Sequence, residues 1–419
     1  MKNDKRTTMP KLRFPEFRTR LGWESIQLGD ASTPVTERVG ERKLTPISIS
    51  AGVGFVPQAE KFGRDISGNQ YSLYTLVRDG DFVYNKGNSL RFPQGCVYQL
   101  RGWGEVAAPN VFISFRLKQG FVAEYFQYCF EKNIHGVQLK QHITSGARSN
   151  GLLNVSKDQF YGVGIPMPLP DEQQKIADCL SSLDELIAAQ MRKVETLKSY
   201  KRGLMQQLFP REGETLPRLR FPEFRNAPEW KETTLASLGE LVSGLTYSPE
   251  DVRESGLLVL RSSNIQNAEI ALDDNVYVTP DIKGANLVKP NDILICVRNG
   301  SKTLIGKSAL IPEGMQLCTH GAFMTVFRAH APQFAFQLMQ SALFHKQVAA
   351  DLGATINSIN GSKLLKYRFV VPGPSEQNRI ADSLSSLTAR IAAEAKNLIG
   401  LKAQKKGLLQ QLFPSLEAV

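Results

Sequence analysis

Five polar, glycine-bearing loops concentrate the side-chain types that proteins use to bind nucleic acids. Lys, Arg and backbone amides contact phosphates, whereas Arg, Lys, Asn, Gln, Ser and Thr on exposed loops read base edges. The loops are NKGNSLRFPQG (85–95), KQHITSGARSNG (140–151), RSSNIQN (261–267), VRNGSKTLIGK (297–307) and GATINSINGSK (353–363). The residues predicted to contact DNA are Lys86, Asn88, Arg91, Arg148, Arg261, Asn264, Arg298, Lys302 and Asn357.

These loops recur at matching positions in the two halves of the chain. NKGNS (85–89) and VRNGS (297–301) each follow a predicted strand, and the stretches 144–157 and 352–363 each precede the final strand of their half. Recurrence of this kind indicates a shared binding face. The alternative is a set of ordinary solvated loops, because Gly, Asn and Ser are common turn formers.

The composition predicts a soluble globular protein of two to three domains, with 419 residues, 42% of them hydrophobic and 22% charged. The net charge of +11 suits an acidic partner, most often a nucleic acid. We find neither a secretory signal nor a run of about 18 apolar residues, so we expect a cytoplasmic protein without a membrane segment. The five cysteines form no C-x-x-C pair, which favours reduced thiols.

The motifs of common enzymes are absent or incomplete. The N/D-P-P-Y/F and glycine-rich cofactor loops of a methyltransferase do not occur. SKTLIGKS (301–308) ends like a P-loop, but Ser301 stands where the first glycine should be. PDIK (280–283) lacks the second acidic element of a nuclease site, and the five histidines lack metal-ligand spacing. We therefore expect no catalytic site, metal or cofactor in this chain.

The chain contains an internal repeat. PKLRFPEFR (10–18) returns as PRLRFPEFR (217–225), and residues 171–210 realign with 375–414 at an offset of 204 (375 − 171), with 22 of 40 positions identical. The repeat units are about 11–210 and 218–414. The bodies between the shared blocks differ in sequence, which suggests the same task performed on two different targets.

The bodies are predicted to be mixed α/β. Short β-branched and aromatic runs predict strands at GDFVYN (80–85), VFISFRL (111–117), DILICV (292–297) and MTVFRA (324–329). Helical spacing predicts one helix over 122–132 and another over 334–353.

Two long helices are the clearest structural prediction. Residues 171–209 and 375–413 carry apolar side chains at alternating spacings of three and four for over four heptads. Asp171 and Ser375 are the predicted N-caps, and each helix is about 58 Å long. Packing of each helix on its own domain is the alternative to pairing. We favour antiparallel pairing, because it relates the halves by a pseudo-twofold axis and places the bodies at opposite ends.

Polar residues interrupt both heptad patterns at equivalent positions. Gln190 and Glu394 occupy d positions, and Lys201 and Lys405 occupy a positions. We expect Lys201 to approach Glu394 and Lys405 to approach Gln190. Buried polar pairs of this kind set the register of a coiled coil at a cost in stability.

This pattern resembles the specificity subunits of type I restriction–modification systems over nearly the whole chain. The resemblance rests on the two RFPEF motifs, on EQQKIADCLSSLD (172–184) and EQNRIADSLSSLT (376–388), and on the QQLFP ends of the helices. It implies two target-recognition domains that each read one half of a split double-stranded DNA target. It also implies no catalytic activity, two methyltransferase (M) subunits as partners, and translocating endonuclease (R) subunits in the full complex. S-adenosylmethionine and ATP are then expected only on those partners.

The expected fold is therefore α+β, with two tandem target-recognition domains separated by an antiparallel coiled coil. The predicted boundaries are 1–168 for the first recognition domain, 169–212 for the first spacer helix, 213–373 for the second recognition domain and 374–419 for the second spacer helix. Three alternatives stay open: a specificity partner of a related fused restriction–modification enzyme, a coiled-coil scaffold with two binding heads and no DNA, and an enzyme in its own right.

The repeated nonapeptide is predicted to be structural. Phe14, Phe17, Phe221 and Phe224 are spaced for packing, and Glu16 and Glu223 are expected to pair with nearby arginines. In an antiparallel arrangement the first copy can lie near the end of the second helix. We expect the nonapeptide to hold each body on the helices, with a methyltransferase-facing surface as the alternative.

Overall fold

The computed structural model describes residues 8–87, 92–143, 152–352 and 357–415. The chain forms two compact units. The first unit comprises Met1–Gln190 and Asn397–Val419, and the second comprises Met191–Lys396. Each unit thus combines one α/β body with parts of both long helices, α6 (Pro170–Leu208) and α10 (Pro374–Leu412).

The body of the first unit contains two four-stranded sheets. Their strand orders are β2-β9-β6-β7 and β4-β3-β8-β5, and the pairing is antiparallel except between β3 and β8. The strands are β1 (Glu24–Gln27), β2 (Ser32–Pro34), β3 (Thr45–Ser50), β4 (Gly54–Pro57), β5 (Thr75–Arg78), β6 (Phe82–Asn85), β7 (Cys96–Gln99), β8 (Glu105–Ala108), β9 (Ile113–Leu117) and β10 (Gly164–Met167). The helices are α1 (Leu28–Ala31), α2 (Gln58–Phe62), α3 (Ala123–Glu131), α4 (Ile134–Leu139) and α5 (Lys157–Tyr161).

Despite its different sequence, the second body repeats the strand order of one sheet, because β12-β21-β18-β19 matches β2-β9-β6-β7. Its other sheet has the order β13-β17-β14-β20, in which the parallel pair β14–β20 lies at an edge, whereas in the first body the parallel pair β3–β8 is central. The strands are β11 (Lys231–Thr234), β12 (Gly239–Ser243), β13 (Val252–Arg253), β14 (Leu257–Leu260), β15 (Ile265–Gln266), β16 (Glu269–Ile270), β17 (Val276–Val278), β18 (Ile293–Cys296), β19 (Ser308–Leu310), β20 (Cys318–His320), β21 (Met324–Ala329) and β22 (Arg368–Val371). The helices are α7 (Pro332–Met339), α8 (Ala342–Asp351) and α9 (Gly361–Leu364).

The four predicted strands are present as β6, β9, β18 and β21. The helix predicted over 334–353 is wrong as a single element, because it divides into α7 and α8. Ser341 lies at the division, and its hydroxyl accepts a hydrogen bond from the Phe344 amide at 3.3 Å, so it caps α8. The long helices begin at Pro170 and Pro374, one residue before the predicted caps, in the first-turn position that suits proline.

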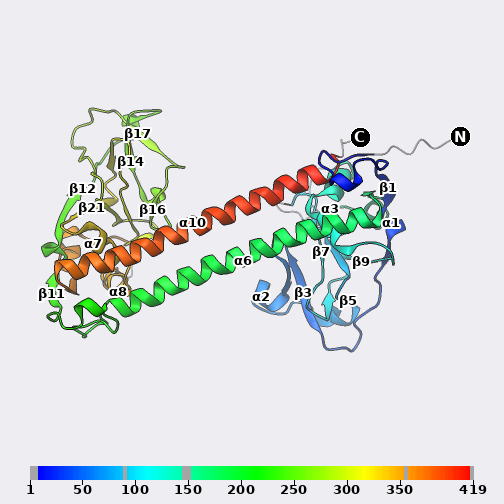
Figure 1. Cartoon of the computed structure of the whole chain (residues 1–419), viewed down its shortest axis with the longest axis horizontal. Helices are drawn as coiled ribbons and strands as arrows, with labels where there is room; N and C mark the ends of the chain where they lie inside the picture. The colour runs from blue at the N-terminus through cyan, green and yellow to red at the C-terminus, as the bar shows by residue number, and fades with distance from the viewer. Residues whose placement is uncertain (1–7, 88–91, 144–151, 353–356, 416–419) are drawn as a thin grey trace. The chain divides into compact units, whose positions relative to one another are not determined.

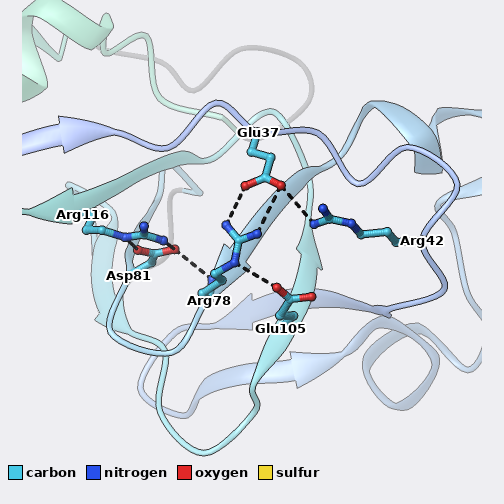
Figure 2. A network of polar contacts seen from close by, with 6 residues as sticks. All are labelled: Glu37, Arg42, Arg78, Asp81, Glu105 and Arg116. Carbon is cyan, nitrogen blue, oxygen red and sulfur yellow. Dashed lines mark hydrogen bonds and ion pairs between the residues drawn. The ribbon is translucent and has the colours of Figure 1, made fainter.

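A buried aspartate directly precedes β6 in the first body and β18 in the second. Asp81 lies in the turn between β5 and β6, is fully buried, and accepts hydrogen bonds from Arg116 on β9 at 2.6 and 3.0 Å. Asp292 and Arg328 repeat this pair in the second body at 2.9 and 2.8 Å. In the first body Arg78 extends the network to Glu37 and Glu105 (Figure 2). Hydrogen bonding from Arg78 lowers the pKa of Glu37.

The long helices pack against each other in opposite directions within each unit (Figure 1). In the first unit the α10 residues Leu409 and Leu412 share a buried cluster with the α6 residues Ile176 and Leu180. In the second unit the end of α6 packs in the same way on the beginning of α10, through the buried Leu208, Phe209, Ile380, Ala381 and Leu384. The predicted antiparallel pairing is therefore confirmed in each unit separately.

Candidate nucleic-acid interface

Three of the predicted loops meet at one edge of the second body. Beyond the end of β18, Val297 O accepts a hydrogen bond from Ile359 N at 2.8 Å, and Asn299 N donates to Asn357 O at 3.3 Å. The Asn357 side-chain amide donates to Gly300 O at 3.0 Å, which closes the contact between 297–302 and 357–359. The Asn299 amide then donates to the Ser262 hydroxyl at 3.0 Å. Asn299 therefore joins all three loops.

Two of the predicted cations lie exposed at this edge. Arg298 projects beside Phe323, with its guanidinium carbon 5.6 Å from the centre of the ring. Lys302 begins a short 3-10 helix, Lys302–Leu304, and is also exposed. Arg298, Asn360 and Lys363 further line a hollow of about 490 Å³. Exposed cations next to asparagine and serine side chains can contact both phosphates and base edges.

Arg261 and Asn264, the two residues of the 261–267 loop that were predicted to contact DNA, have different surroundings. Arg261 is half-buried and pairs with Asp274 at 2.8 Å, so part of its charge is already balanced. Asn264 is fully buried, and its amide donates to Ala271 O at 2.9 Å and Asp274 O at 3.2 Å. The prediction that Asn264 contacts DNA is therefore corrected: this side chain holds the loop together and offers no exposed atom.

The first body has the same arrangement of strand ends. Lys86 O accepts a hydrogen bond from Leu153 N at 2.8 Å, as Val297 does from Ile359 in the second body. Gly87 forms a β-bridge with Leu152, as Arg298 does with Ser358. Lys86 is half-buried and its ammonium lies 3.4 Å from Val155 O. The predicted contacts Asn88, Arg91 and Arg148 lie outside the described residues.

Sequence reasoning did not select Asn299, Phe323 or Val111. Asn299 belongs to a predicted loop. Its hydrogen bonds with Ser262 and Asn357 depend on the tertiary fold, which brings those two residues beside it. Phe323 and Val111 belong to no polar loop. The usable sequence signal was an apolar residue at the beginning of the strand predicted over 111–117 and another directly before the strand predicted over 324–329.

The polar residues of the long helices have other partners than predicted. In the second unit the Lys201 ammonium donates to the Thr388 hydroxyl at 2.7 Å, and Glu394 pairs with Lys193. In the first unit Lys405 pairs with Asp184 at 2.7 Å and Glu131 at 2.8 Å. The expected partners were Glu394 for Lys201 and Gln190 for Lys405. Each lies six residues beyond the observed partner in its helix (394 − 388 and 190 − 184), which is about 9 Å along the helix axis.

These lysine contacts are equivalent in the repeat but differ in charge. Thr388 and Asp184 occupy matching positions, 204 residues apart (388 − 184), so the first unit has an ion pair where the second has a hydroxyl. Burial lowers the pKa of Lys201, because desolvation disfavours the charged ammonium.

The repeated nonapeptide contacts both long helices in each unit. Leu12 N donates to Gln411 O near the end of α10, and Leu219 N donates to Gln207 O near the end of α6, both at 2.9 Å. Arg13 then pairs with Glu172 in the first turn of α6. These contacts agree with the predicted holding role of the nonapeptide.

The glutamates of the nonapeptide also contact the long helices. Glu16 pairs with Lys175 at 3.3 Å and Glu223 pairs with Arg379 at 2.9 Å. The expected arginine partner is therefore found for Glu223, while a lysine takes that place for Glu16.

The described residues contain neither a metal-binding cluster nor a membrane-spanning helix. Among residues 8–87, 92–143, 152–352 and 357–415, no three His, Cys, Asp or Glu side chains are grouped to hold a metal ion. Within the same part of the chain, no helix has the length and apolar character needed to cross a membrane.

Comparisons with known proteins agree with this architecture. Residues 98–199 and 228–403 match the model of the type I restriction modification DNA specificity domain. The MjaVIII type I restriction enzyme specificity subunit of Methanocaldococcus jannaschii is 26% identical, over 97% of this chain and 94% of its own. The EcoKI specificity subunit of Escherichia coli is 29% identical over 171 residues, which cover 39% of this chain and 37% of its own.

Solved structures share the fold over the full length of the chain. The type I restriction–modification S subunit from M. genitalium has a TM-score of 0.59 at 14% identity and covers 98% of this chain and 100% of its own. A chain from a structure of type I R-M complex assembly has a TM-score of 0.57 at 16% identity and covers 97% and 100%. The chain therefore belongs to the family of type I restriction–modification specificity subunits, which recognise DNA and are not themselves catalytic.

Proposed function

We propose that this chain reads an asymmetric, bipartite DNA target, with one half-site for each body. The observation that carries the proposal is the repeated body with divergent loops. The sheets β2-β9-β6-β7 and β12-β21-β18-β19 have equivalent strand orders, and polar loops lie at equivalent strand ends of the two bodies, but the loop sequences differ. Two readers of one architecture and different loops are suited to two different half-sites separated by a spacer of unread sequence.

The long helices set the spacer length in this proposal. Each helix has 39 residues, which corresponds to about 58 Å. Half-sites about 34 Å apart along the duplex present the same face of DNA to both readers. The helices are of the right scale for this distance.

The chain works with partner subunits. Type I specificity subunits bind DNA in complexes with methyltransferase and restriction subunits. We propose two methyltransferase subunits for this chain, because its twofold internal repeat presents each docking surface twice, and we propose a cytoplasmic location. S-adenosylmethionine and ATP are assigned to those partners.

Single-molecule mapping of DNA methylation tests the proposal. Cells expressing this chain with its cognate methyltransferase are expected to carry methylated sites with two different half-sites and a constant spacer. Inserting one heptad into both long helices is expected to lengthen the spacer by about 10 Å, or about three base pairs, without changing either half-site. A continuous target, or an unchanged spacer in the heptad variant, contradicts the proposal.

A scaffold without DNA binding is the second candidate for this architecture. A gel shift at increasing salt separates the two functions, because binding through phosphates weakens steeply with salt. A partner that is a fused restriction–modification enzyme is distinguished by which subunits copurify with the chain.

A further inference from the structure

Val111 and Phe323 are exposed apolar side chains at the same position of the two bodies. They are 44% and 57% exposed. In the first body Phe82 pairs with Phe115, and in the second Ile293 pairs with Phe327, so Val111 and Phe323 each precede the paired phenylalanine by four residues. Single exposed apolar residues are common on proteins. Their recurrence at one topological position in divergent sequences is what requires an explanation.

Each of these residues lies in a tight turn that enters a central strand. Phe112 N donates to Pro109 O at 3.0 Å, and Met324 N donates to Gly321 O at 2.8 Å. The turns join β8 to β9 and β20 to β21. Solvent-exposed turns of this kind usually carry Gly, Asn, Asp or Ser. The backbone hydrogen bond holds the apolar side chain at the tip of the turn in both bodies.

The turn of the second body lies at the edge where the predicted DNA-binding loops meet, and the turn of the first body leads into the equivalent strand. Phe323 O accepts hydrogen bonds from the amides of Val297 and Arg298, each at 3.1 Å, and the Arg298 guanidinium lies over the Phe323 ring. In the first body the ladder between β6 and β9 ends at the pair Tyr84–Ile113; Lys86 follows Tyr84 by two residues, and Val111 precedes Ile113 by two residues. Phe323 therefore neighbours a cationic side chain that suits base reading, and Val111 occupies the equivalent position before β9 in the first body.

We propose that Val111 and Phe323 are specificity-determining residues that each contact the 5-methyl group of a thymine in the major groove, one in each half-site. This inference rests on the proposed function. The thymine methyl is the apolar group that a base pair presents in the major groove, and apolar side chains recognise it by contact. The polar neighbours read hydrogen-bonding groups, so an apolar residue among them adds recognition that those neighbours cannot supply. The different sizes of Val and Phe suit the two readers to different half-sites.

Deoxyuridine substitution tests this contact, because it removes only the methyl group. The full-length chain, in complex with its methyltransferase subunits, is titrated with duplexes of the mapped target in which each thymine in turn is replaced by deoxyuridine. The wild-type complex is expected to bind about three- to fivefold more weakly when one particular thymine in each half-site is replaced, which is the effect of about one buried methyl group. Phe323→Ala should abolish this discrimination in one half-site, and Val111→Ala should abolish it in the other.

Matched controls come from exposed apolar residues at the opposite ends of the same strands. Trp103 precedes β8 and Leu317 precedes β20, with exposures of 37% and 67%. Trp103→Ala and Leu317→Ala should keep the thymine preference of both half-sites. Phe323→Val, which installs the residue of the first body, provides a variant with a smaller volume change than Phe323→Ala, and a thermal melt of each variant verifies folding.

Three results would overturn the inference. The first is that the wild-type complex binds every deoxyuridine duplex as tightly as the thymine duplex. The second is that a mapped half-site contains no A·T pair. The third is that the Phe323→Ala complex keeps the wild-type ratio of affinities for the thymine and deoxyuridine duplexes. Weaker binding of Phe323→Ala with an unchanged ratio would indicate insertion between base steps instead. If mapping finds no bipartite target, the proposed function itself fails; if the target is bipartite and the methyl groups are neutral, only this inference fails.

Discussion

Arg13 and Glu172 form a buried bidentate ion pair, with Nε–Oε1 and Nη2–Oε2 distances of 2.7 Å. Arg220 and Glu376 repeat the pair in the second unit, with both distances at 2.8 Å. The glutamate lies in the first turn of a long helix, where a negative charge also interacts favourably with the helix dipole. The nonapeptide therefore holds the beginning of one long helix through a buried ion pair and the end of the other through a backbone hydrogen bond.

Replacing Arg13 with Ala should destabilise the first unit by about 3–5 kcal/mol, because it leaves the Glu172 carboxylate buried without its partner. Chemical denaturation, with hydrogen exchange at the first turns of α6, measures the loss. Arg220→Ala should do the same to the second unit.

The exposed pair Arg20–Asp171 is the control for this prediction. Its side chains are 39% and 53% exposed. Arg20→Ala should therefore change the free energy of unfolding by less than about 1 kcal/mol. Equal effects of Arg13→Ala and Arg20→Ala would show that the buried pair does not hold the nonapeptide on the helix.

The two equivalent lysines of the long helices should respond differently to removal of their charge. Lys405→Leu should destabilise the first unit, because Asp184 and Glu131 lose their shared cation. Lys201→Leu should be neutral or stabilising by about 1 kcal/mol, because its partner Thr388 keeps a hydrogen bond to Leu384 O at 2.8 Å. The free energy of unfolding of each variant measures the difference.

The same variants test the register role proposed for Gln190, Lys201, Glu394 and Lys405. Disulfide crosslinking between engineered cysteines on α6 and α10 reports the register of each unit. A double variant of Lys201→Leu and Glu394→Leu that keeps the wild-type crosslinks would argue against a role in register.

Arg298→Ala should weaken binding of DNA to the second half-site by about 1–3 kcal/mol. The guanidinium is exposed at the meeting point of three loops. If Arg298 contacts a base, the variant should relax the preference at one position; if it contacts a phosphate, all sequences should bind more weakly and the salt slope should fall by about one unit.

Arg368 provides the control for this experiment. Its side chain is 72% exposed and pairs with Glu232 on β11, and neither residue belongs to a predicted DNA-binding loop. Arg368→Ala should leave both affinity and salt slope near their wild-type values. An Arg298→Ala complex that behaves like this control would remove Arg298 from the interface.

The first unit should lose stability in mild acid through His135. This ring is buried against Tyr84 and Phe130, and burial lowers its pKa to about 4, compared with 6.5 in the unfolded chain. As the pH falls from 6.5 to about 4, the unfolded chain takes up a proton that the folded chain does not. The free energy of unfolding should therefore fall by about 3 kcal/mol over this window and level off below it.

His135→Phe should flatten this part of the pH profile, because it keeps an aromatic ring in place and removes the titrating group. His142→Gln, at an exposed position of the same unit, is the control and should leave the profile unchanged. Parallel profiles for His135→Phe and the wild-type chain would refute the assignment.

The sequence by itself determined the repeat, the two long helices, the strands β6, β9, β18 and β21 and the matching positions of the polar loops. These features depend on local periodicity, and periodicity is written in the order of residues. The antiparallel pairing was also predicted from the sequence. Narrow heptad patterns favour one partner helix each, and the antiparallel direction relates the two repeats by a pseudo-twofold axis.

Tertiary structure alone decided the lysine partners and the roles of individual loop residues. A heptad pattern repeats along its length, so it does not specify which residues of two helices lie opposite each other; contacts at the ends, such as Leu12 with Gln411, add that information. Asn264 and Arg298 are both polar loop residues in sequence, yet one is buried and the other exposed. Burial depends on what packs around a residue, and those neighbours come from distant parts of the chain.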